Sequence, residues 1–156
     1  MNNMKTVYVA GSFNGAPRIR IEAGRLTEYG YRVLSRWFNP DDFIEKAWDK
    51  DFNGKVAESM ATGDVYSILE ADVFIIDTFD KSTTGGRDVE LGVALARKLD
   101  GHPLRIIRIG PSVNIFHTLV RETYPDWNTF LENESGCYPP QSYKWSYTDG
   151  STEPNS

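Results

Sequence analysis

The sequence predicts an α/β domain in which a mainly parallel sheet of four to five strands lies between two layers of helices. Short apolar runs alternate with longer segments of helical periodicity, in the order β-α-β-α-β-α-β-α. The connections between these runs have ten residues or more, which is what parallel strands require. Parallel sheets are apolar on both faces, so helices must cover both, and a three-layer sandwich results.

The first part of the chain supplies two strands with a helix between them. Residues 5–10 read as a buried strand that ends in Gly11 and Ser12. Pro17 suits the first position of a helix, and Gly30 suits its end. This helix is expected to bury Ile19, Ala23 and Leu26. The second strand is predicted at residues 31–36.

Residues 37–55 form a long polar connection that carries five aromatic side chains, those of Trp37, Phe38, Phe43, Trp48 and Phe52. Long connections in compact domains are often lids or binding loops. Trp37 directly follows the second strand. It either stacks on a flat base or packs as an ordinary aromatic side chain.

The second part of the chain repeats the strand and helix alternation. A helix is predicted over about residues 55–70, with one stripe formed by Ala57, Met60, Ala61, Asp64 and Ile68. Further predicted elements are a strand at 72–78, a helix to about residue 98, a strand at 104–109, and short helices near 113–120 and 126–132. The α/β domain therefore spans residues 1–132, and the polar, turn-rich residues 133–156 are predicted to be an irregular tail.

Composition excludes several classes of protein. The 156 residues are 40% hydrophobic and 25% charged, which is typical of a soluble globular domain. A net charge of −5 without a basic stripe disfavours a nucleic-acid polymer as partner. The single cysteine, Cys137, rules out an internal disulfide framework and fits the cytoplasm. The chain has neither an apolar run of about 20 residues nor a signal peptide, so no membrane is expected. Two histidines give no zinc-binding cluster.

The unusual residues of the chain fall at the carboxyl ends of the predicted strands. These ends carry Gly11 and Ser12, Arg36 and Trp37, residues 78–90, and Gly110 with Pro111. In open parallel sheets, ligands bind outside this edge, near the switch in strand order. We therefore expect the functional site there.

The most informative stretch is Gly-Gly-Arg-Asp-Val-Glu-Leu-Gly at residues 85–92. This stretch follows a predicted buried strand and begins a predicted buried helix. Glu90 lies at a position where the pattern otherwise has small or apolar residues. A carboxylate near a helix N-terminus is favoured by the helix dipole. Glu90 is therefore either a local cap or a catalytic group, and we favour catalysis.

Asp64 is a second carboxylate in an unexpected place, on the core-facing side of its predicted helix. A buried carboxylate must be paired or hydrogen-bonded. Asp64 could cap the glycine loop, pair with Arg87 or bind a ligand. Two carboxylates at one cleft resemble the pairs that cleave glycosidic bonds, where one attacks the anomeric carbon and the other orients the sugar or moves a proton.

Two further groups of residues are candidates with open alternatives. The turn at Gly11 and Ser12 could cradle an anion with help from Arg18, or be a plain tight turn. It lacks the spacing of a dinucleotide-binding motif. Asn114 and His117 could reach a ligand or simply cap a short helix.

Four motifs together resemble the nucleoside 2-deoxyribosyltransferase superfamily over residues 5–131. They are Tyr-Val-Ala-Gly-Ser at 8–12, Ala-x-x-Asp at 61–64 leading into Ala-Asp-Val at 71–73, the motif at 85–92, and Gly-Pro at 110–111 with Asn-Ile-Phe-His at 114–117. The last resembles uncharacterised and phage-encoded members. The resemblance implies a flavodoxin-like (Rossmann-like) sheet and cleavage of an N-glycosidic bond.

The resemblance also implies roles for individual residues. Glu90 matches the nucleophile that forms a covalent glycosyl intermediate, and Asp64 matches the aspartate that contacts sugar or base. Family members are dimers or larger, which implies a homodimer or higher homo-oligomer here, with Asn114 and His117 completing a neighbour's site. The full set expected to bind substrate is Tyr8, Gly11, Ser12, Arg18, Trp37, Thr84, Gly86, Arg87, Asp88, Asn114 and His117.

The sequence therefore predicts cleavage of a (deoxy)nucleoside or its 5′-monophosphate, resolved by a second base in a transferase or by water in a hydrolase. Thr84 stands where transferases of the family carry an aspartate, and with Ser12 it favours the related nucleotide hydrolases. Neither a metal nor a redox cofactor is needed for this chemistry. The alternative is a non-catalytic protein that binds a nucleotide in the same cleft.

Overall fold

A computed structural model describes residues 4–40 and 54–134. They form a five-stranded sheet of β1 (Lys5–Ala10), β2 (Tyr31–Val33), β3 (Val73–Asp77), β4 (Arg105–Ile109) and β5 (Glu122–Tyr124). All four strand pairings are parallel, and the spatial order is β2-β1-β3-β4-β5. This is the strand order of flavodoxin-like folds. The predicted fold class is confirmed.

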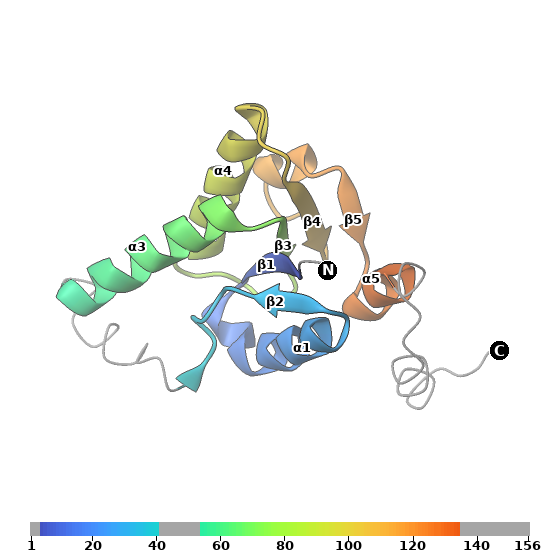
Figure 1. Cartoon of the computed structure of the whole chain (residues 1–156), viewed down its shortest axis with the longest axis horizontal. Coiled ribbons are helices and arrows are strands. Elements are labelled where there is room, and N and C mark those ends of the chain that lie inside the picture. The colour runs from blue at the N-terminus through green and yellow to red at the C-terminus, as the bar shows by residue number, and fades with distance from the viewer. Residues whose placement is uncertain (1–3, 41–53, 135–156) are drawn as a thin grey trace.

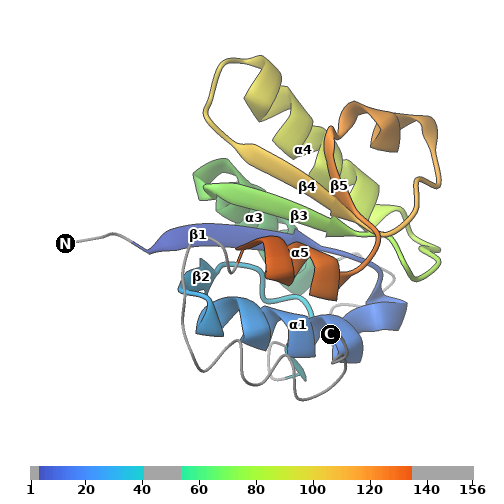
Figure 2. The ribbon, with the colours of Figure 1, turned by 90° about the vertical axis from the view of Figure 1, so that its right-hand side faces the viewer.

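Helices cover both faces of the sheet (Figures 1 and 2). One face carries α1 (Ala16–Glu28) and α5 (Trp127–Glu134), and the other carries α3 (Lys55–Glu70) and α4 (Gly86–Leu99). The short 3₁₀ helix η3 (Ile115–Leu119) lies on the α4 side, and η1 (Phe13–Gly15) precedes α1.

The central strands form the core because their side chains are apolar on both faces. All five residues of β3 and the last four of β1 are buried. The side chains of Ile19, Ala23 and Leu26 on α1 are also buried, as predicted. This rigid centre fixes the carboxyl edge of the sheet, where β1 and β3 end next to one another.

Four predicted details differ from the structure. The second strand ends at Val33 rather than at residue 36, although the Leu34 amide still donates to the Val7 carbonyl at 2.8 Å. β5 lies in a stretch where no strand was predicted. The last helix continues to Glu134, past the predicted domain end at 132. Residues 135–156, with Cys137, lie outside the described residues, as do Phe43, Trp48 and Phe52.

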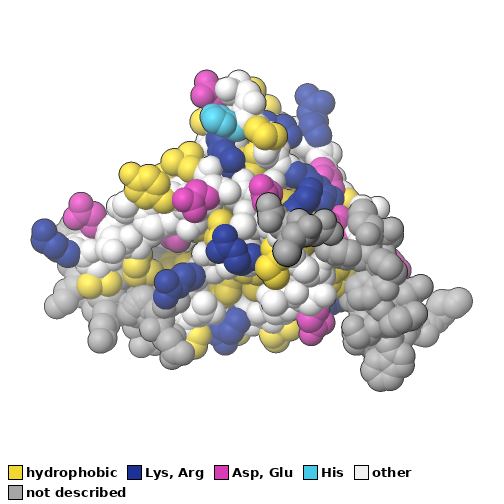
Figure 3. Space-filling view, viewed as in Figure 1, with side chains coloured by type: hydrophobic (Ala, Val, Ile, Leu, Met, Phe, Trp, Pro, Cys, Tyr) yellow, Lys and Arg dark blue, Asp and Glu magenta, His cyan; other side chains and the backbone are white. Residues whose placement is uncertain are grey.

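The fourth difference concerns α3, whose predicted core stripe is mostly wrong. Only Ile68 of this helix is buried, whereas Ala61 is exposed and Asp64 is half-buried. Figure 1 shows that the N-terminal half of α3 extends beyond the sheet, so its inner face cannot pack on strands. Val56, Val65, Tyr66 and Leu69 of α3 are exposed apolar side chains. Figure 3 shows hydrophobic side chains on the surface over this helix.

Candidate active site

Tyr8, Glu90 and Asp64 come together from three elements at one place. Tyr8 is fully buried in β1, and its hydroxyl donates a hydrogen bond of 2.8 Å to Glu90 Oε2 on α4. Asp64 on α3 also interacts with the Tyr8 hydroxyl, and its charge acts on Glu90. The structure therefore places the two predicted carboxylates beside each other, with a phenol between them.

Burial raises the pKa values of this cluster, and neighbouring carboxylates add to the rise at Glu90 and Tyr8. The pKa of Glu90 rises to about 8, chiefly through desolvation and then through the charge of Asp64, while the Tyr8 hydrogen bond acts in the opposite direction. Desolvation raises the pKa of Asp64 to about 6, and the Tyr8 hydroxyl again lowers it. Burial and the two carboxylates raise the pKa of Tyr8 well above its ordinary value. Two interacting carboxyl groups with separated pKa values are typical of acid and base chemistry.

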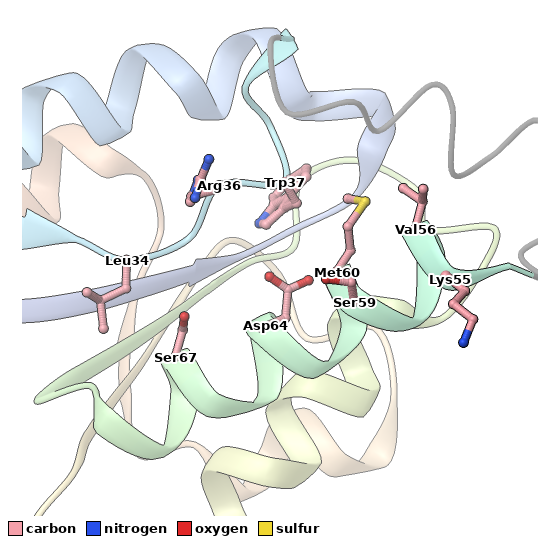
Figure 4. A pocket seen from close by; sticks show the side chains of 10 residues that line it. Leu34, Arg36, Trp37, Lys55, Val56, Ser59, Met60, Asp64 and Ser67 are labelled. Atoms are coloured by element: carbon pink, nitrogen blue, oxygen red, sulfur yellow. The ribbon is translucent and has the colours of Figure 1, made fainter.

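A pocket of about 760 Å³ opens beside this cluster (Figure 4). It lies between α3 and the segment that follows β2, and Asp64 points into it. Its lining consists of Leu34, Arg36, Trp37, Lys55, Val56, Ser59, Met60, Gly63, Asp64 and Ser67. The volume lies within the range of small-molecule sites. Asp64 is therefore the link between the pocket and the Tyr8–Glu90 pair.

The first turn of α4 is held in place from two sides, and this positions Glu90. Gly85 has φ of +79°, a left-handed conformation that suits glycine, and it starts the helix without a side-chain cap. Arg87 is buried, and its Nη1 donates to the carbonyls of Asp80 at 2.6 Å and Asp77 at 3.4 Å. Asp88 accepts a hydrogen bond of 2.7 Å from His117. Arg87 thus fixes the loop after β3 instead of pairing with Asp64.

His117 and Asn114 bind within their own chain. His117 is fully buried, and its Nδ1 accepts from the Val113 amide at 3.1 Å, so Nε2 carries the proton that it donates to Asp88. Asn114 caps η3, because its Oδ1 accepts from the amides of Phe116 and His117. The capping alternative is confirmed for Asn114. His117 is buried against Asp88 of its own chain, and its role in a neighbouring subunit's site stays a prediction.

The turn after β1 is fastened to the loop after β3. Ser12 donates to the Lys81 carbonyl at 2.8 Å, and its hydroxyl accepts from the Asn14 amide at 3.2 Å. At Gly11, a Cβ atom would collide with Ile19. These contacts give Ser12 a structural role at the carboxyl edge of the sheet.

Arg18 is engaged by two carboxylates on the α1 side of the sheet. Its guanidinium forms a bidentate pair with Asp77, at 2.8 Å for each bond, and a further bond of 2.6 Å to Asp80. Asp77 is fully buried and also accepts a hydrogen bond of 2.7 Å from the Trp127 indole N–H. Since both carboxylates already neutralise it, Arg18 is a poor candidate for binding the 5′ end of a substrate.

Trp37 packs as an ordinary aromatic side chain, and its stacking on a base stays a prediction. It is only 7% exposed, its indole N–H donates to the Val9 carbonyl at 2.8 Å, and Phe13 and Phe38 pack against it edge to face. It also lines the pocket. Thr84 and Gly86 are exposed in the loop and first turn that lead to Glu90.

Sequence reasoning missed most of the pocket wall on α3. Val56, Met60, Gly63 and Ser67 follow one another at helical spacing and all line the pocket. The available signal was the composition of this stripe, which mixes small, polar and apolar residues and is therefore unlike a core face.

Within residues 4–40 and 54–134, no group of three or more His, Cys, Asp or Glu side chains could hold a metal ion. None of the helices in these ranges is both long enough and apolar enough to span a membrane.

No protein-family model matches this chain, and no curated protein sequence matches it. Among solved structures, the chain is similar to the CMP N-glycosidase BcmB of Clostridium botulinum, with a TM-score of 0.48 and 20% sequence identity. The match covers 83% of this chain and 97% of the other.

Proposed function

We propose that this protein cleaves the N-glycosidic bond of a nucleoside or of its 5′-monophosphate, with Glu90 as nucleophile. The observation that carries the proposal is the cluster of Tyr8, Glu90 and Asp64 at the edge of a pocket of about 760 Å³. A local cap does not explain Glu90, because its partner is a buried phenol and not a backbone amide. Perturbed carboxyl groups beside a pocket are typical of catalytic sites.

In this mechanism the ionised Glu90 attacks C1′ of the sugar. The bond from C1′ to the base nitrogen breaks, its electron pair leaves with the base, and the base takes up a proton. A sugar ester on Glu90 results. Water or a second base then attacks C1′ and gives up a proton to Asp64. The ester bond between C1′ and Glu90 breaks and the carboxylate is restored, so water gives hydrolysis and a second base gives transfer.

The neighbours of Glu90 have supporting tasks. Tyr8 donates its hydrogen bond to the carboxylate and so favours the ionised, nucleophilic form. Asp64 faces the pocket and remains ionised at lower pH than Glu90, so it can accept hydrogen bonds from sugar hydroxyls or take a proton. Trp37 and Leu34 provide apolar wall for a base.

Chromatography of released bases tests this function. Purified protein is incubated with nucleosides, deoxynucleosides and their 5′-monophosphates, with and without a second free base. Glu90→Gln is expected to lower turnover at least a thousandfold. Glu28→Gln, the same chemical change on an exposed residue of α1, is the matched control. Equal turnover in Glu90→Gln and wild type would overturn the mechanism, and binding without turnover would favour a binding protein.

A homo-oligomer remains part of the proposal. Val113, Ile115, Phe116 and Leu119 around η3 are 53% to 76% exposed, and Val89 on α4 is 68% exposed. Exposed apolar side chains in such number favour association. Light scattering coupled to size exclusion measures the mass directly. A monomer at micromolar concentration would contradict this part.

A further inference from the structure

Gly63 stands in the interior of α3, where glycine is unfavourable. The helix runs from Lys55 to Glu70, so Gly63 is several residues from either end and caps neither. Glycine inside a helix loses more conformational freedom on folding than alanine does. Gly24 inside α1 shows that a helix can hold an exposed glycine without packing or a ligand, so what sets Gly63 apart is its place in the pocket.

Packing within the described chain does not require a glycine at this position. A Cβ atom built at Gly63 has no neighbouring atom within 4 Å among the described residues. Gly11 and Gly110 differ in this respect, because a Cβ atom there would collide with Ile19 and Thr78 respectively. The fold of the described chain would accept a side chain at Gly63.

The position of Gly63 in the pocket is what distinguishes it. Gly63 lines the pocket between Met60 and Ser67 on the same helical stripe, and it directly precedes Asp64. Trp37 and Leu34 face α3 across this pocket (Figure 4). The pocket wall therefore has an aromatic and an aliphatic side chain on one side, and on the α3 side the helix backbone is uncovered at Gly63, between Met60 and Ser67.

From this arrangement we infer that Gly63 determines specificity, because the base of the substrate lies against the uncovered α3 backbone at this residue. A flat heterocycle needs a slot with two close walls, and the missing side chain keeps this slot open beside Asp64. The inference rests on the proposed function and names the residue that admits the base.

Two substitutions separate this role from a structural one. Gly63→Ala fills the slot with one methyl group, and Gly63→Leu fills it further with another good helix former. Gly24→Ala is the matched control, since Gly24 lies exposed inside α1 with no atom of the described residues near its Cβ position and outside the pocket. Both alanine variants are expected to raise the Tm by roughly 2–4 °C.

The measurements are thermal unfolding, kcat and KM for base release, and ligand-induced Tm shifts with the same panel of nucleosides and 5′-monophosphates. We expect Gly63→Ala to lower kcat/KM at least about tenfold, mainly through KM, and Gly63→Leu to lower it further. Gly24→Ala should keep wild-type kinetics. A stabilised protein that binds its substrate less well is a combination that mere damage to the fold does not produce.

The outcomes distinguish this inference from the proposed function. If wild type releases base and Gly63→Ala does so with unchanged kcat/KM, the inference about Gly63 is wrong and the proposed function stands. If the substitution changes the oligomeric mass in light scattering, Gly63 serves subunit contact and the inference is again wrong. If no compound is cleaved by wild type or raises its Tm, both are wrong.

Discussion

Replacing Glu90 by glutamine should make the protein more stable at alkaline pH while abolishing turnover. The pKa of Glu90 is about 8 in the folded chain, against an ordinary value of 4.5. The folded state therefore holds this proton more tightly than the unfolded state does. The stabilisation from the proton is complete below pH 4.5 and is lost as the pH rises through 8. Glutamine does not ionise, so the variant escapes this loss.

The magnitude follows from the two pKa values. The difference between about 8 and 4.5 corresponds to about 5 kcal/mol at full ionisation. Glu90 is half-buried, and its titration is coupled to that of Asp64, so we expect about 2 kcal/mol at pH 9. For a chain of this length, 2 kcal/mol corresponds to a Tm increase of about 4–8 °C.

Urea denaturation followed by circular dichroism at pH 5, 7 and 9 measures this effect. The gap in the free energy of unfolding between Glu90→Gln and wild type should be small at pH 5 and should widen toward pH 9. Glu28→Gln, on exposed surface, should follow wild type throughout. A Glu90→Gln variant that is less stable than wild type at pH 9, or a gap that does not change with pH, would refute the reasoning.

Three more predictions concern the same edge of the sheet. Because about a tenth of Glu90 is ionised at pH 7 and about nine tenths at pH 9, kcat/KM for base release should rise roughly tenfold over this interval; a flat profile would contradict this. Tyr8→Phe removes a hydrogen bond that lowers the pKa of Glu90, so the midpoint of that profile should move to higher pH, and a downward shift would count against the assignment. Arg18→Ala leaves the buried Asp77 with one partner fewer and should lower the free energy of unfolding, measured by urea denaturation. Because Arg18 is partly exposed, we expect a decrease of about 2–3 kcal/mol. A selective rise in KM for 5′-monophosphates in this variant would instead show that Arg18 binds the phosphate.

The fold could be predicted because its signals are local. The apolar residues of β1, β3 and β4 lie within a few positions of one another in each strand, and the long connections between the strands require parallel pairing. β5 could not be predicted in this way. Its three residues, Glu-Thr-Tyr, have no buried member, and only pairing with Arg108 and its neighbours at the sheet edge makes them a strand.

The candidate site was predictable where a residue contradicted its surroundings. Glu90 and Asp64 were conspicuous as carboxylates on apolar patterns, and the structure brings both to Tyr8. The sequence makes Arg18 and His117 candidates for binding substrate because Arg18 follows the turn after β1 and His117 follows β4 beside Asn114. Their partners, Asp77 and Asp88, are 59 and 29 residues away, and only the packed loops decide those pairings.

The fastening of the turn after β1 to the loop after β3 has a consequence for protein engineering. Ser12 and Arg18 reach across to Lys81 and Asp80, and Asp80 also occupies the space that a side chain at Gly15 would need. Grafting either segment alone from another scaffold would sever these cross-links, so the two must be exchanged as one cassette. On the α3 side of the pocket, Ser59, Met60 and Gly63 form no comparable cross-link to another loop among the described residues. Directed evolution of substrate preference should therefore begin with libraries on that helix and leave the paired loops untouched.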